Sequence, residues 1–162
     1  MKTIELNMGS NMKRAQQRGV AAVEFAFMLI LLLIIVAGIV EFGRAFWYYN
    51  ALAKATRDGA RYMSTVPKDS IYTETQSGSA TLQLVVAEAN AAALVPAITE
   101  GNVTITCLPS ACANGTAPTD VSVAITGYDI TIGGLIPFFL PTGGTTTYTR
   151  TLSPYTTMRY MK

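Results

Sequence analysis

The chain contains no histidine, and only 14% of its 162 residues are charged. Without an imidazole, the side chain that most often works as a general acid or base is missing. Cys107 and Cys112 are the two cysteines, and two sulfurs supply only half of the ligands of a structural zinc site. We therefore expect no histidine-based catalysis, no metal and no cofactor.

The carboxylates of the carboxy-terminal part are also unpromising for catalysis, because they are scattered and form no paired motif. They are Asp69, Glu74, Glu88, Glu100, Asp120 and Asp129. No glycine-rich loop joins a strand pattern to a helix pattern. The sequence thus predicts a protein that is not an enzyme.

Proline is absent from residues 20–63, and charge is absent from Phe25 to Val40. Such a stretch favours one continuous helix, with about 20 apolar residues to cross a bilayer. We expect a helix over 20–63 whose first half, about 20–41, spans a membrane. Trp47, Tyr48 and Tyr49 then form an aromatic belt at the outer interface.

Charge is unevenly placed around this apolar run. Residues 1–19 carry four cations and one carboxylate, a formal +3, so the rest carries −1 of the overall +2. No basic patch follows, which argues against nucleic-acid binding. The positive-inside rule places 1–19, a leader without predicted structure, in the cytoplasm and residues 64–162 on the other side of the membrane. In an oxidising compartment Cys107 and Cys112 are expected to form a disulfide.

The exported part shows a helical pattern followed by alternating ones. Residues 64–79 form a polar linker, and a second helix is expected from Ser79 to Pro96. Its apolar stripe comprises Leu82, Val85, Val86, Ala89 and Ala93. Four segments then favour strands: 103–107, 121–125, 145–151 and 155–161. The apolar segment 135–140 is interpreted as a plug over one end of the sheet, with an exposed contact patch as the alternative. The fold class is α+β, with a short antiparallel sheet of 3–4 strands.

Glu24 lies at the front of the apolar run, five residues after Gly19. A carboxylate at the edge of a membrane helix costs free energy and usually has a function. If the chain is cut between Gly19 and Val20, Glu24 becomes the fifth residue and can neutralise the terminal ammonium of a neighbouring subunit. The alternatives are an uncut signal anchor whose glutamate reaches the interface, and a secretory signal cut near 36–38.

A second group of residues lies further along the same helix. Ala51, Ala55 and Gly59 are four apart and share a face that allows close helix approach, and Arg57 and Arg61 share another. This surface serves contacts between subunits, packing on the chain's own domain, or both. Glu41 and Arg44 can form an ion pair, which contributes little if exposed.

Three sequence elements together resemble the TadE-like family of the tight adherence (Flp, type IVb) pilus system. They are Gly19-Val-Ala-Ala-Val-Glu-Phe25, Val40-Glu41-Phe42-Gly43-Arg44 and Thr56-Arg57-Asp58-Gly59-Ala60-Arg61. The resemblance implies a pilin-like fold and a minor pilin or pseudopilin. It further implies cleavage after Gly19 by a prepilin peptidase, assembly roles for Glu24 and Phe25, and other pilins and the inner-membrane assembly platform as partners.

Our prediction is thus a single-pass membrane protein with a structural role in assembling a surface filament. Residues 20–63 carry the assembly surface, including Glu24, Phe25, Glu41, Arg44, Arg57, Gly59 and Arg61. The alternative is an unprocessed, permanently anchored periplasmic binding or scaffold protein.

Overall fold

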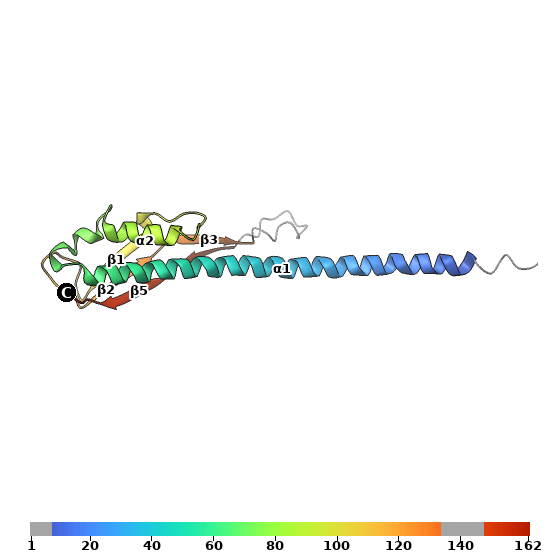
Figure 1. Cartoon of the computed structure of the whole chain (residues 1–162), viewed down its shortest axis with the longest axis horizontal. Coiled ribbons are helices and arrows are strands. Elements are labelled where there is room, and N and C mark those ends of the chain that lie inside the picture. The colour runs from blue at the N-terminus through green and yellow to red at the C-terminus, as the bar shows by residue number, and fades with distance from the viewer. Residues whose placement is uncertain (1–7, 134–147) are drawn as a thin grey trace, which may run out of the picture.

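A long helix carries a small α+β domain at its carboxy-terminal end (Figure 1). The computed structural model describes residues 8–133 and 148–162, and side-chain environments from residue 19 onward. Helix α1 extends from Met8 to Thr65. It therefore begins within the segment that we interpreted as a leader without structure, because nothing in residues 8–18 breaks a helix. The predicted plug at 135–140 lies outside the described residues.

Two short 3₁₀ turns, Lys68–Ser70 and Thr73–Thr75, lead from α1 to helix α2, Ala80–Asn90. Ser79 is the N-cap of α2, and its hydroxyl accepts a hydrogen bond from the amide of Leu82. This agrees with the predicted start. The helix ends at Asn90, earlier than predicted, and Ala93 is exposed with a φ of 54°. Ala93 therefore does not belong to the apolar stripe.

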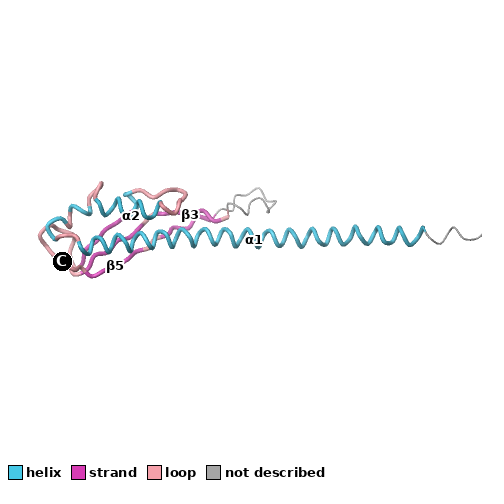
Figure 2. Tube along the Cα trace, viewed as in Figure 1, coloured by secondary structure: helices cyan, strands magenta, loops and turns pink. Residues whose placement is uncertain are grey.

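Five strands form two antiparallel sheets. A third 3₁₀ turn, Glu100–Asn102, leads into β1, Val103–Leu108. The strands β2, Asp120–Ile125, and β5, Tyr155–Arg159, complete a sheet of order β1-β2-β5. The strands β3, Tyr128–Ile132, and β4, Tyr148–Leu152, form a separate two-stranded ribbon (Figure 2). The α+β class with a long apolar helix is confirmed, but β3 and the division into two sheets were not predicted.

The core lies where α1, α2 and the three-stranded sheet meet. Val121, Val123 and Ile125 of β2 are fully buried, as are Leu52 and Met63 of α1. The end of the chain returns to α1, because the amide of Met161 donates to the carbonyl of Ser64 and the Tyr160 hydroxyl donates to that of Val66. The carboxy-terminal half of α1 is thus an integral element of the domain, while its amino-terminal half projects from it (Figure 1).

Candidate functional site

The projecting half of α1 presents apolar side chains on all sides. From Val20 to Val40 every side chain is exposed or half-buried, and none is buried by another described element. Among the described residues, α1 is the one helix that is both long enough and apolar enough to cross a membrane. An uncovered apolar surface of this size is not stable in water. This half of α1 has the length and composition of a single-pass membrane anchor.

Gly19, Val20, Glu24 and Phe25 lie together on this uncovered stretch. A Cβ atom added at Gly19 would meet nothing within 4 Å, and Phe25 is 68% exposed. Glu24 is exposed and makes no hydrogen bond or ion pair with any described residue. In the isolated chain the Glu24 carboxylate is therefore not neutralised by the described part of the fold.

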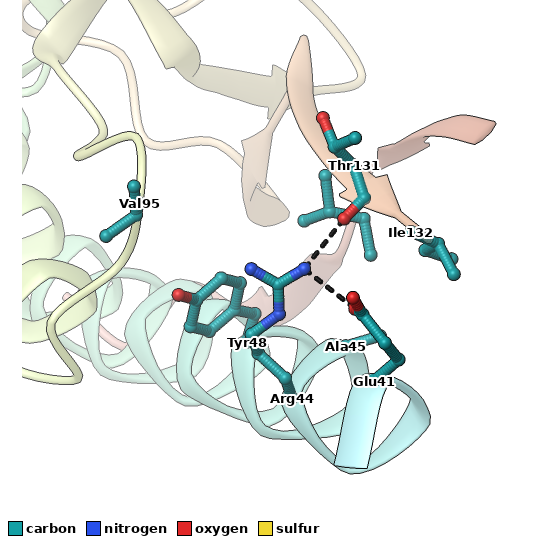
Figure 3. A pocket seen from close by; sticks show the side chains of 8 residues that line it. Glu41, Arg44, Ala45, Tyr48, Val95, Thr131 and Ile132 are labelled. Atoms are coloured by element: carbon teal, nitrogen blue, oxygen red, sulfur yellow. Dashed lines mark hydrogen bonds and ion pairs between the residues drawn. The ribbon is translucent and has the colours of Figure 1, made fainter. Parts of the chain in front are cut away.

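Glu41 and Arg44 form the predicted ion pair, but in an unexpected setting. The Nη2 atom of Arg44 lies 2.8 Å from Oε2 of Glu41 and also donates to the carbonyl oxygen of Thr131 at 2.8 Å (Figure 3). Glu41 is only 3% exposed. The Glu41 carboxylate is therefore buried, whereas the Arg44 side chain is 44% exposed, and the guanidinium joins α1 to β3.

An aromatic pair continues this junction on the domain side. The rings of Tyr48 and Tyr128 meet edge to face, with centroids 6.4 Å apart. Tyr48 is buried and therefore does not belong to the interfacial belt, whereas Trp47 and Tyr49 are exposed. Burial raises the pKa of Tyr128, and its hydroxyl has no partner among the described residues. The adjoining hollow, about 10 Å³, has room for about one water molecule and none for an organic ligand.

The small-residue face of α1 packs on the chain's own domain. Ala55 and Gly59 are buried, and a Cβ at Gly59 would collide with Cγ2 of Val85 in α2. Of the two roles predicted for that face, these contacts are packing on the chain's own domain. Arg57 and Arg61 point outward and are exposed, without an ion pair in the part of the chain that the structure describes.

Part of the sequence of α1 matches a known protein family. Residues 19–61 match the model of the family described as TadE-like protein. Searches of curated proteins and of solved structures found no match.

The TadE-like segment coincides with the helix and leaves the sheets outside. It starts at Gly19, next to the apolar run, and ends at Arg61, one turn before α1 ends. All the predicted assembly residues lie within it. Thr131, which completes the Glu41–Arg44 junction, lies outside it and could not be found from sequence, because a main-chain carbonyl acceptor leaves no residue-type signal.

Cys107 and Cys112 lie outside the TadE-like segment, at the end of the domain opposite the projecting half of α1. They are joined by a disulfide with a Cα–Cα distance of 5.0 Å, which matches the predicted pairing. The loop that follows is held by the Asn114 side chain, which accepts from the amide of Tyr72. Over residues 8–133 and 148–162, no three metal-binding side chains cluster.

Proposed function

We propose that this chain is a minor pilin or pseudopilin that takes part in assembling a tight-adherence (Flp, type IVb) pilus. The observation that carries the proposal is the coincidence of the TadE-like segment, residues 19–61, with a helix whose first half is uncovered. A helix that is apolar on all sides needs a bilayer or sister helices around it. A pilin meets both environments, first in the membrane and then in the filament.

In this account the prepilin peptidase cleaves between Gly19 and Val20. Gly19 has the small side chain that a peptidase site accepts, and its surroundings within the described fold are open. Cleavage creates an ammonium group at Val20. A carboxylate and an ammonium group attract strongly in an apolar environment, because the low dielectric does not screen them.

Glu24 then sets the register of assembly. Its carboxylate has no partner in the described chain, so an incoming subunit's terminal ammonium can supply one. An unpaired carboxylate among apolar helices is costly, and pairing with an ammonium group lowers that cost. Phe25 and the apolar residues that follow pack against sister helices, and exposed Arg57 and Arg61 are available for lateral contacts outside the membrane.

The test is piliation of cells that carry variants of the full chain. Gly19→Leu should block cleavage, while Gly19→Ala keeps a small residue and should be processed. Glu24→Ala should be processed but fail to assemble, while Glu24→Asp keeps the charge and should retain partial assembly. Normal piliation with both Gly19→Leu and Glu24→Ala would refute the proposal and favour a permanently anchored scaffold or binding protein.

A further inference from the structure

Large apolar side chains gather on the end of the domain that faces the projecting half of α1. We call this group the apolar collar. Its members come from three separate parts of the chain and are each at least 60% exposed: Phe42, Phe46 and Trp47 of α1, Val95 of the loop after α2, and Tyr148 of β4.

Hydrogen bonds, a shared hollow and strand pairing place these parts at one level along α1. The Trp47 indole donates to the carbonyl of Ala92 at 3.4 Å, and Val95 lines the same hollow as Arg44 (Figure 3). Arg44 in turn holds the carbonyl of Thr131. Tyr148 pairs with Ile132, the neighbour of Thr131 on β3, so it lies at the same end of the ribbon.

The length of the apolar run of α1 determines how far the collar lies from the hydrocarbon core of the bilayer. The stretch Val20–Val40 measures about 32 Å at 1.5 Å per residue, close to the roughly 30 Å hydrocarbon core of a bilayer. Residues 42–47 then lie within about 10 Å of the core, at the height of the lipid headgroups. Tryptophan and tyrosine favour this layer because their rings are apolar and their N–H or O–H groups are polar.

The charges near the collar suit the same environment. Glu41 is buried and paired with Arg44, which leaves no exposed carboxylate on this turn of α1. On the ribbon, Arg150 is exposed close to Tyr148, while the Asp129 carboxylate, further from this end, accepts a hydrogen bond from Thr151. Exposed cations near the surface are attracted to anionic headgroups.

We propose that the apolar collar is a lipid-binding surface through which the exported domain rests on the outer face of the bilayer. Val95 and Tyr148 then hold the domain against the membrane, in addition to its covalent connection through α1. The occupant is lipid because the collar continues directly from the apolar run of α1. The inference requires that α1 anchors the chain in a membrane, as the proposed function also does. It requires no step of filament assembly.

Depth-dependent fluorescence quenching tests this in the full chain, reconstituted into phosphatidylcholine–phosphatidylglycerol vesicles. Trp47 is the single tryptophan, so its emission reports on the collar without substitution. Both native cysteines are in the disulfide, so Val95→Cys provides one thiol for an environment-sensitive dye. Tyr72→Cys, at an exposed apolar position at the opposite end of the domain, is the matched control, and Phe27→Cys reports on the anchor.

Nitroxides on the lipid headgroup should quench Trp47 and the Val95 label more strongly than nitroxides deep in the acyl chains, and should leave the Tyr72 label unchanged. A Val95 label as unquenched as the Tyr72 label overturns the inference, while quenching at Phe27 shows that the anchor stands. Val95 fluorescence that responds to protein concentration and not to nitroxide lipid would assign the collar to a second copy instead. An unquenched Phe27 label would overturn the anchor and with it the proposed function.

Discussion

The guanidinium of Arg44 donates a hydrogen bond of 2.8 Å to the carbonyl oxygen of Thr131, 87 residues further along the chain. The same Nη2 atom is paired with the buried carboxylate of Glu41, one turn earlier on α1. One side chain at the end of the apolar run thus joins the membrane helix to the β3–β4 ribbon. Since a two-stranded ribbon is marginally stable alone, this junction should control its order.

Replacing Arg44 tests that junction. Arg44→Ala should destabilise the ribbon locally by about 1–3 kcal/mol, because it removes charge-assisted hydrogen bonds and leaves a buried carboxylate without this partner. Arg44→Lys should recover only part of the loss, since an ammonium lacks the planar fork of guanidinium. Hydrogen exchange of residues 128–132 in micelles provides the measurement, with β1 as the internal control. Unchanged exchange in Arg44→Ala would contradict the role.

Gly59 should be intolerant of any side chain. In Gly59→Ala the new methyl group collides with Val85, and overpacking of this kind costs about 1–3 kcal/mol. Gly43→Ala is the matched control: its Cβ meets nothing within 4 Å, so the change should be neutral or slightly stabilising. Thermal unfolding compares the two, and Val85→Ala should rescue Gly59→Ala. A lack of rescue would mean that the packing described here does not limit this position.

The helices could be predicted from sequence because their signals are local. Ser79 marks the start of α2, and the proline-free apolar run marks α1. The strand β4 overlaps the predicted segment 145–151, whereas β3 could not be predicted, because it is short and its burial depends on Tyr48 and Arg44, which lie far away in sequence. The same holds for the burial of Glu41: spacing predicts the pair with Arg44, but only the tertiary fold determines its exposure. The face of Gly59 likewise had two interpretations that only packing could separate.

The disulfide should stabilise the far end of the domain modestly. It closes a short loop, so in the loop-closure model its removal costs roughly 2 kcal/mol. Replacing Cys107 and Cys112 together by serine should lower the Tm by the amount that this loss of stability implies. Reductant should lower the Tm of the native chain to a similar value. Reductant should not affect the double variant, which controls for side effects. An equal Tm with and without reductant in the native chain would show that the bridge contributes nothing.

Glu100 should make the start of α2 sensitive to acid. Its pKa is lowered, first by the hydrogen bond from the Ser77 hydroxyl and then by that from the Gly78 amide. A depressed folded pKa means that the stabilisation is present above the ordinary value of 4.5 and is lost as the pH falls through the lower, folded value. NMR titration should show the Gly78 amide shifting with Glu100, and Glu100→Ala should abolish this. A Gly78 amide that does not titrate would contradict the linkage.

The central claim is that this chain is processed as a pilin, and the amino terminus of the protein in its native membranes tests it most directly. Intact mass and amino-terminal sequencing should give a chain that begins at Val20, with Glu24 as its fifth residue. A chain that begins at Met1 would contradict processing and remove the main support for filament assembly. A chain that begins near Ile39 would contradict the account altogether, because the anchor would have been removed.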